Sequence, residues 1–322
     1  MKKINIGLLG LGNIGTGTYK VLETNRKEIE ETVGGSVNIT KILEKDIDRP
    51  RDISVPREAF VSDPEEIFSD PDIDIVIELL GGVEPATTMI ERALNSGKHV
   101  VTANKAAVAA NYHRLMDAAS SHGVTLRFEA SVGGGIPVLT PLTSCLKANR
   151  FTRVLGIVNG TTNYILDMMT TEGLPYDQVL KDAQDKGFAE ADPTADVEGI
   201  DAANKLSILM ALMFDHYVHP DDIPTKGITS VTGDDIEKAK KNGQVIKLIA
   251  SAEKTEDGNI NYEVSPMCLD ESHPLSGVRR EYNAVFVEGN MVGSLMFYGP
   301  GAGPLPTGSA VMGDVIEIAK TL

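Results

Sequence analysis

A glycine-rich turn between an apolar strand and a helix constrains the fold of this chain most strongly. Residues 4–9 form a short apolar run typical of a buried strand, and Gly10-Leu-Gly12-Asn-Ile-Gly15 leads into a helical pattern over 14–32. In this setting the glycines permit a tight turn, close approach of the backbone to a pyrophosphate, and close helix–strand packing. The pyrophosphate would bind the N-terminal amides of the helix near Asn13. The turn therefore predicts a dinucleotide-binding unit.

Short apolar runs continue to alternate with helical patterns up to residue 129. The expected strands cover 37–43, 74–80, 99–102 and 125–129, and the expected helices cover 84–96 and 104–122. This alternation is typical of parallel sheets with helices on both faces. We therefore predict an α/β protein whose first domain, 1–135, is a Rossmann-type doubly wound parallel sheet.

The pattern changes at Gly133-Gly-Gly135-Ile-Pro137, which marks a domain boundary. Helices are then expected over 137–147, 161–171, 176–186 and 195–214, with long antiparallel strands over 244–254, 259–268 and 284–297. We predict an α+β domain for substrate binding and dimerisation over 136–300. A turn and a helix over 301–322 should pack back on the first domain.

Composition excludes several classes of protein. Asp plus Glu outnumber Lys plus Arg by 46 to 30, and there is no Trp, so binding to nucleic acid is disfavoured. The longest apolar stretch, 206–214, is shorter than the ~20 residues of a membrane span, and the N-terminus lacks a signal-peptide pattern. Cys145 and Cys268 are expected to be free thiols of a reducing compartment, with Cys145 buried in a helix. We expect a soluble, cytoplasmic protein without membrane partners.

The side chains that would read the ribose of the dinucleotide follow the strand at 37–43. Acids would accept a hydrogen bond from a free 2′-hydroxyl, whereas bases would bind a 2′-phosphate. Both are present, namely Glu44 and Asp46 on one side and Lys45, Arg49 and Arg51 on the other. The sequence leaves the choice between NAD and NADP open.

Two more loops follow predicted strands, where open α/β sheets bind ligands. One contains Gly81, and the other is Thr102-Ala-Asn104-Lys105. A cation is disfavoured at a helix N-terminus, so Lys105 is better explained by binding phosphate, ribose or a substrate carboxylate.

Five carboxylates stand within twelve residues, from Glu190 to Asp201, and Lys205 follows one helical turn later. An exposed i,i+4 ion pair is one explanation, worth only a few tenths of a kcal/mol. The apolar continuation over 206–214 instead predicts a half-buried Lys205, which needs a partner. Such a lysine can protonate or stabilise a developing alkoxide.

Together these motifs resemble homoserine dehydrogenases over nearly the whole chain. The stretches that carry the resemblance are 10–15, 101–105, 129–137, Asn159-Gly-Thr-Thr-Asn-Tyr-Ile165, the acidic stretch ending at Lys205, and 298–307. The resemblance implies NAD(P)-dependent interconversion of L-homoserine and L-aspartate 4-semialdehyde, in the threonine and methionine branch of amino-acid biosynthesis. Separately, the long alternating strands of the second domain could pair across a two-fold axis, so a homodimer or a dimer of dimers is expected.

The resemblance also implies residue roles. Lys205 would donate the proton, oriented by Asp201, with Lys105 as a second lysine at the reacting centre. Glu190, Asp196, Asp201 and Lys105 would bind the substrate. Glu129, Val132, Gly134 and Ile136 would bind a sodium ion, largely through backbone oxygens. NADP or NAD would contact Gly10, Gly12, Asn13, Ile14, Gly15, Lys45, Gly81, Thr102, Lys105 and Gly303.

Two departures and two alternatives accompany this hypothesis. Asn204 stands where the family often has His or Arg, and the chain ends at Leu322, so the C-terminal threonine-sensing domain of longer relatives is expected to be absent. One alternative is a dinucleotide-binding redox sensor without dehydrogenase activity. The other is a different amino-acid semialdehyde dehydrogenase that uses a cysteine thiol, which a buried, inert Cys145 would disfavour.

Overall fold

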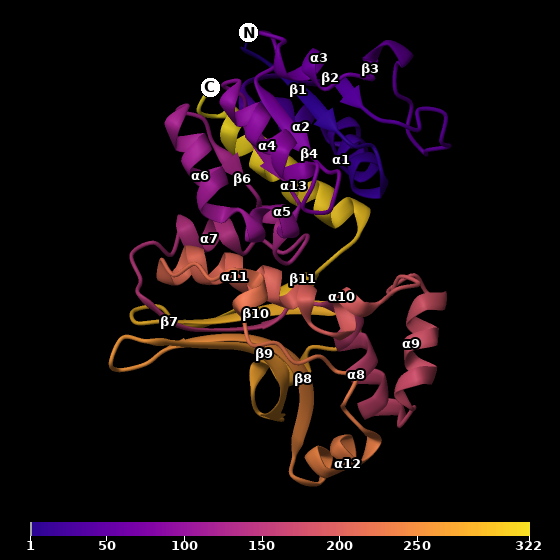
Figure 1. The fold of residues 1–322 in the computed structure, drawn as a ribbon, viewed down its shortest axis with the longest axis vertical. Coiled ribbons are helices and arrows are strands. Elements are labelled where there is room, and N and C mark those ends of the chain that lie inside the picture. Colours follow the sequence, from indigo (N-terminus) through magenta and orange to yellow (C-terminus); the bar gives the residue numbers. More distant parts are fainter. Residues whose placement is uncertain (1) are drawn as a thin grey trace. The chain divides into compact units, whose positions relative to one another are not determined.

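The computed structural model describes residues 2–322, and the chain divides into two compact units (Figure 1). One unit holds the chain up to Gly135 together with Ala302–Leu322, and the other is Ile136–Gly301. Among the described residues, no helix is long and apolar enough to cross a membrane.

The first unit contains a six-stranded parallel sheet in the order β3-β2-β1-β4-β5-β6. This is the doubly wound Rossmann order, in which ligands bind where the chain reverses direction beside β1. The strands are β1 (Lys2–Leu9), β2 (Gly35–Leu43), β3 (Phe60–Val61), β4 (Ile75–Glu78), β5 (His99–Thr102) and β6 (Leu126–Arg127). The predicted fold class is confirmed.

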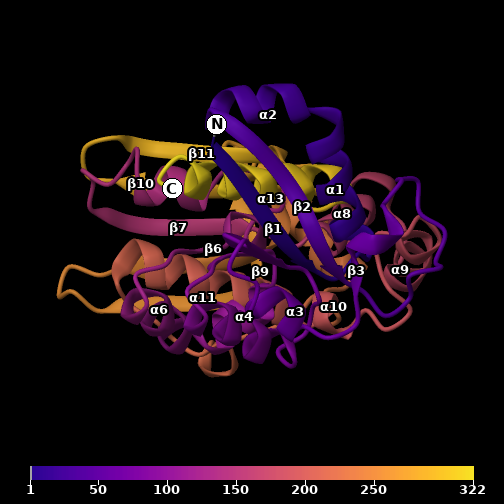
Figure 2. The same ribbon diagram turned by 90° about the horizontal axis from the view of Figure 1, so that it is seen from above.

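Helices cover both faces of this sheet (Figure 2). Apolar side chains of α1, α2 and α13 form one continuous core with β1 and β2, including Leu22, Ile29 and Val315. The helices of the unit are α1 (Asn13–Thr24), α2 (Arg26–Val33), α3 (Glu65–Phe68), α4 (Ala86–Asn95), α5 (Lys105–Ala110), α6 (Tyr112–Ser121) and α13 (Pro304–Ala319), with 3₁₀ turns η1 (Arg57–Ala59) and η2 (Glu129–Ser131).

The C-terminal helix α13 packs tightly against α1. A Cβ atom at Gly17 of α1 would lie 2.2 Å from the Pro304 carbonyl oxygen, and one at Gly308 of α13 would lie 2.7 Å from the Thr18 nitrogen. Two glycines therefore allow the helix backbones to approach this closely, which brings the beginnings of α1 and α13 to one region of the unit.

The second unit is built on a five-stranded antiparallel sheet in the order β11-β10-β7-β8-β9. Its strands are β7 (Phe151–Ile157), β8 (Gln244–Lys254), β9 (Ile260–Asp270), β10 (Tyr282–Gly289) and β11 (Gly293–Pro300). Its helices are α7 (Leu139–Thr143), α8 (Gly160–Glu172), α9 (Tyr176–Asp185), α10 (Thr194–Val197), α11 (Ile200–Phe214) and α12 (Gly233–Lys241), with 3₁₀ turns η3 (Pro220–Asp222) and η4 (Pro274–Gly277). Both α8 and α11 pack against β8.

Several predicted elements were too long. The helix expected over 14–32 is interrupted at Asn25, and the one over 104–122 at Asn111, because neither asparagine has helical backbone angles. The strand expected over 284–297 is a hairpin, since Gly289 pairs with Gly293 across a turn. The helix expected over 137–147 ends at Thr143, and Gly199, with a φ of 84°, separates α10 from α11. The strand β7 and the helix α12 were not predicted.

Candidate dinucleotide and substrate sites

The three glycines of the first turn meet three different requirements. Gly10 has a φ of +94°, and a Cβ atom there would lie 2.9 Å from the Leu79 carbonyl oxygen. A Cβ atom at Gly15 would lie 2.3 Å from the Gly10 oxygen, so the helix can begin here only with glycine. Gly12 has nothing within 4 Å of its Cβ position, which leaves the backbone before Asn13 open to a ligand.

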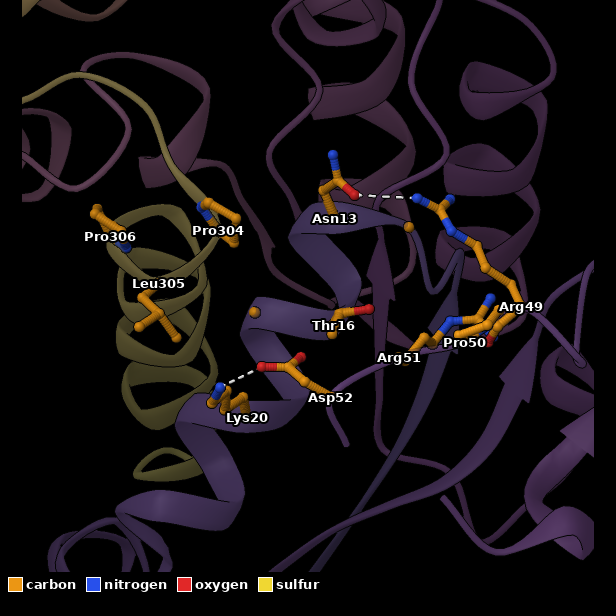
Figure 3. Close-up of a pocket in the computed structure, with 12 residues that line it drawn as sticks. Asn13, Thr16, Lys20, Arg49, Pro50, Arg51, Asp52, Pro304, Leu305 and Pro306 are labelled. Atoms are coloured by element: carbon orange, nitrogen blue, oxygen red, sulfur yellow. Dashed lines mark hydrogen bonds and ion pairs between the residues drawn. The ribbon is translucent and has the colours of Figure 1, made fainter. Parts of the chain in front are cut away.

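A cavity of about 530 Å³ opens beside this turn. Figure 3 shows Asn13 at the start of α1, whose side-chain oxygen accepts a hydrogen bond from Arg49 at 3.3 Å. Pro304, at the start of α13, lies on the opposite side of the cavity. The charged side chains of its lining are three cations and one carboxylate: Lys20, Arg49, Arg51 and Asp52. Lys20 and Asp52 form an ion pair. Arg51 pairs with Glu44 outside the lining, whereas Arg49 contacts the neutral side chain of Asn13, so Arg49 is the cation that attracts anions to the cavity.

The two acids and three bases after β2 do not have equivalent surroundings. Glu44 accepts hydrogen bonds from the backbone N–H groups of Leu11 at 2.8 Å and Asp46 at 3.0 Å, and lies 3.4 Å from Arg51. Burial alone would raise the pKa of Glu44, but these partners together lower it. Arg51 also donates to the Leu11 and Asp46 carbonyl oxygens. Glu44 and Arg51 therefore fasten the loop, whereas Arg49 is exposed at the cavity.

Lys45 is exposed, and it is not one of the residues that line the cavity. The remaining bases of this loop are therefore better placed than Lys45 to contact a ligand in the cavity. Asp46 is likewise exposed.

A buried carboxylate, missed by the sequence analysis, connects the loops after β4 and β5. Glu78 is fully buried and accepts hydrogen bonds from the Leu80 N–H at 2.7 Å and the Thr102 hydroxyl at 2.6 Å. Thr102 in turn accepts from the Asn104 N–H at 2.9 Å, and the Asn104 side chain donates to the Gly82 oxygen at 2.7 Å. Burial raises the pKa of Glu78, although these hydrogen bonds oppose the shift. Its only sequence signal is a carboxylate at the end of an apolar strand.

This network holds the positions expected to contact the cofactor. Gly81 and Gly82 both have positive φ angles, at 81° and 71°. Lys105 is the first residue of α5 and is half-buried, with Asn104 as the N-cap. The loop carrying Gly81 and the loop carrying Thr102 and Lys105 are therefore fixed to each other through Glu78.

In the second unit, Lys205 is buried on α11 rather than paired in solvent. Its residue exposure is 8 %, and its Nζ donates to Asp201 Oδ2 at 2.6 Å and to the Val158 carbonyl oxygen at 2.6 Å. Asp201 is 6 % exposed. The predicted burial of Lys205 is confirmed, and an exposed ion pair is excluded.

The expected substrate carboxylates have different surroundings. Asp196 of α10 and Asp201 of α11 both accept hydrogen bonds from one side-chain amide, that of Asn159, at 2.7 and 2.9 Å. Glu190 is exposed on the segment between α9 and α10, and its carbonyl oxygen accepts from Gln184. The structure thus brings Asp196, Asp201 and Lys205 together around Asn159, which sequence reasoning did not select. Its signal was its place as an N-cap before a helix.

The segment expected to hold sodium begins in η2. Glu129 is buried, and its backbone N–H donates to Asp314 Oδ2 of α13 at 2.8 Å. Burial raises the pKa of Asp314 to about 7, opposed by this hydrogen bond. Val132 is fully buried, Gly133 and Gly134 have φ angles of 78° and 56°, and Ile136 is buried in the second unit. No cluster of three or more His, Cys, Asp or Glu side chains suited to a metal occurs within residues 2–322.

The prediction of a buried Cys145 was wrong. The helix α7 ends at Thr143, and Cys145 lies exposed in the turn that follows. Cys268 is also exposed, and both are free thiols.

A doubly wound sheet with an anion-attracting cavity at its glycine turn, accompanied by a buried lysine–carboxylate pair, defines a nicotinamide-dinucleotide-dependent oxidoreductase. Two family models match the chain: "Homoserine dehydrogenase, NAD binding domain" over 10–129 and "Homoserine dehydrogenase" over 137–316. The chain belongs to the homoserine dehydrogenase family. Its reaction is the NAD(P)-dependent interconversion of L-homoserine and L-aspartate 4-semialdehyde, and nothing supports a redox sensor or another semialdehyde dehydrogenase.

Curated and solved relatives agree with this assignment. The chain is 46% identical to the homoserine dehydrogenase of Bacillus subtilis, with 100% of this chain and 74% of the relative covered. A crystal structure of the enzyme from Thiobacillus denitrificans superposes with a TM-score of 0.94 at 42% identity, covering 99% of this chain and 74% of that one. A hyperthermophilic archaeal homoserine dehydrogenase in complex with NADPH gives a TM-score of 0.82 at 26% identity, covering 100% and 99%.

Proposed function

We propose that Lys205 is the proton donor and acceptor of the homoserine reaction. The observation that carries this proposal is the buried ammonium held 2.6 Å from Asp201 Oδ2. As the aldehyde is reduced, its oxygen gains negative charge and takes a proton from Lys205. In the opposite direction, neutral Lys205 removes the hydroxyl proton of homoserine. Asp201 favours the charged form of the lysine and fixes its direction.

The acidic groups near Lys205 suit the ammonium group of the amino-acid substrate. We propose that Asp196, Asp201 and Glu190 bind that ammonium, and that Lys105 acts as a second lysine at the reacting centre. Asp196 and Asp201 are two carboxylates held at one place by the Asn159 amide. Two carboxylates beside the proton donor support binding of a cation there.

The first unit is proposed to bind the dinucleotide, whose nicotinamide supplies the hydride chemistry. The open backbone at Gly12 and Asn13, with Gly10, Ile14 and Gly15 around it, fits a pyrophosphate. Gly81, Thr102, Lys105 and Gly303 are proposed as further contacts, and Gly303 with its φ of 120° begins the turn into α13. Lys45, which is exposed outside the cavity lining, is proposed to contact the outer end of the cofactor.

Between the two cofactors, the cavity favours NADP. Glu44, the acid closest to the end of β2, is already engaged by two N–H groups and by Arg51. Arg49 lies at the cavity with only a 3.3 Å contact to Asn13. We therefore propose that Arg49 binds the 2′-phosphate of NADP.

A sodium ion and a homodimer remain proposals. One carboxylate, that of Glu129, together with backbone oxygens of Val132, Gly134 and Ile136 is a hard-oxygen set suited to an alkali cation.

For the dimer, Tyr282 and Tyr298 stack with their ring centres 5.3 Å apart, beside exposed Met296 on the edge of the second sheet. A second copy of the chain would cover these side chains. The expected cytoplasmic location stays a prediction.

The function is tested by following reduced nicotinamide during oxidation of L-homoserine, with NADP and NAD compared in parallel. Turnover is expected with homoserine, with the higher kcat/KM for NADP. Absence of turnover with both cofactors, by a protein that is folded and binds them, would contradict the proposed function. A higher kcat/KM for NAD would contradict only the role of Arg49.

A further inference from the structure

The side chain of Asn159 joins the two carboxylates beside Lys205. It is 5 % exposed and stands directly before α8, with its Nδ2 atom 2.7 Å from Asp196 Oδ1 and 2.9 Å from Asp201 Oδ2. Lys205 Nζ contacts the same Asp201 oxygen at 2.6 Å. Both hydrogens of one amide are therefore directed at acids that come from two different helices.

The orientation of this amide is fixed by its other end. Asn159 Oδ1 accepts hydrogen bonds from the Thr162 backbone N–H at 2.9 Å and from the Thr162 hydroxyl at 3.0 Å. A flipped amide would place its NH₂ group against that N–H and its single carbonyl oxygen against both carboxylates. The helix cap thus determines that the NH₂ group faces Asp196 and Asp201.

The amide also separates two like charges. Asp196 receives a second hydrogen bond from the Thr161 hydroxyl at 3.0 Å, and Asp201 receives one from Lys205. Without a donor between them, the two carboxylates would repel each other, and one would gain affinity for a proton. A protonated Asp201 would no longer stabilise the ammonium of Lys205.

We infer that Asn159 is a positioning residue for proton transfer: it holds Asp201 ionised and directed at Lys205, and keeps Asp196 apart as a site for the substrate ammonium. This inference rests on the proposed role of Lys205. The role requires an uncharged double donor that also caps a helix, which asparagine combines in one short side chain.

The substitution Asn159→Asp distinguishes the helix-capping role of this side chain from its role as a hydrogen-bond donor to the two carboxylates. Aspartate caps helices as well as asparagine does and can still accept from Thr162, but when ionised it cannot donate to Asp196 or Asp201. The charged groups that then face the new carboxylate are Asp196 from α10 and Asp201 and Lys205 from α11. Because the introduced carboxyl would lie within hydrogen-bond distance of two carboxylates, its pKa should rise, and its protonated form would again be a donor.

The test is the pH profile of kcat for N159D and wild type with homoserine and NADP. We expect N159D to lose roughly 100-fold in kcat at neutral and alkaline pH. The loss should shrink as the pH falls and the introduced group is protonated, while the affinity for NADP stays at the wild-type value. Asn159→Ala should lose activity at every pH, since it has no group to protonate. Asn242→Asp, the same exchange at an exposed asparagine that caps α12 through its backbone N–H, is the matched control and should follow the wild-type profile.

Unfolding by urea gives an independent readout. The stability of N159D relative to wild type should decrease as the pH rises through the pKa of the introduced carboxyl, because repulsion appears only on ionisation. Wild-type kcat in N159D at all pH values, or a loss that does not depend on pH in either measurement, would overturn the inference. If Lys205→Met kept its activity while N159D lost it in the expected pH-dependent way, the role of Lys205 would fail separately from that of Asn159.

Discussion

Asp201 and Lys205 lie one turn apart on α11, with Oδ2 and Nζ 2.6 Å from each other and both side chains buried. A buried ion pair is weak evidence for stability, because desolvation offsets most of its attraction. Replacement by apolar residues would serve packing equally well on the apolar helix that carries the pair. The proposed reaction gives a reason for the pair, because a desolvated ammonium with a fixed partner is suited to proton transfer at an oxygen.

Arg49→Ala should change the cofactor preference. Loss of a charged hydrogen bond to the 2′-phosphate should raise KM for NADP by roughly 10- to 100-fold, with little change for NAD. Arg57→Ala is the matched control, since Arg57 is an exposed arginine of the same loop that pairs with Asp48. Steady-state kinetics with both cofactors check this. An equal change in both KM values would show that Arg49 does not read the phosphate.

Thr102→Val should destabilise the first unit by removing the hydroxyl bound to buried Glu78. Leaving a buried carboxylate with one donor fewer should lower the free energy of unfolding by about 2 kcal/mol. Thr102→Ser keeps the hydroxyl and should remain within about 0.5 kcal/mol of wild type. Urea denaturation of the three proteins measures the difference. An equal loss in Thr102→Ser, which keeps the hydroxyl, would show that the hydrogen bond to Glu78 is not the cause.

Because Lys247 is buried, we expect the free energy of unfolding to increase as the pH rises into the alkaline range. It is 2 % exposed on β8, donates to Asn163 Oδ1 at 2.9 Å and to the Val278 oxygen at 2.6 Å, and burial lowers its pKa to about 8 from 10.5. Between these values the unfolded chain binds more protons than the folded protein, so stability increases with pH.

Relative to Lys247→Met, the wild-type protein should therefore gain roughly 3 kcal/mol of unfolding free energy as the pH rises from below 8 to above 10.5. Urea denaturation of both proteins across this range provides the measurement. Parallel pH curves for the two proteins would show that the Lys247 ammonium is not disfavoured by burial.

Local patterns in the sequence predicted much of the fold. The strand before Gly10 and the alternation that follows it were sufficient for the parallel sheet, and the apolar run after Lys205 was sufficient for its burial. The hairpin over 282–300 was missed because its turn, at Asn290, lies inside an otherwise strand-like run. The helix interruptions at Asn25 and Asn111 were missed for a similar reason: a single polar residue within a helical pattern is common and does not by itself indicate a break.

The groups that sequence reasoning missed have partners far along the chain. Asn159 and Asp201 are 42 residues apart, Glu78 and Thr102 are 24 apart, and Lys247 and Asn163 are 84 apart. Each is polar and buried, so the structure must satisfy it, but its partner is determined by sheet and helix packing rather than by local spacing. Cys145 shows that apolar sequence neighbours do not ensure burial. The helix α7 ends at Thr143, before Cys145, and the thiol is exposed.

The most direct test of the account is the kinetics of Lys205→Met, which keeps most of the side-chain length and removes the ammonium group. The account predicts that kcat for homoserine oxidation falls by roughly 10³-fold or more, while the dissociation constant for NADP and the unfolding cooperativity remain at wild-type values. A variant that is folded, binds NADP normally and retains more than about a tenth of the wild-type kcat would contradict the assignment of proton transfer to Lys205.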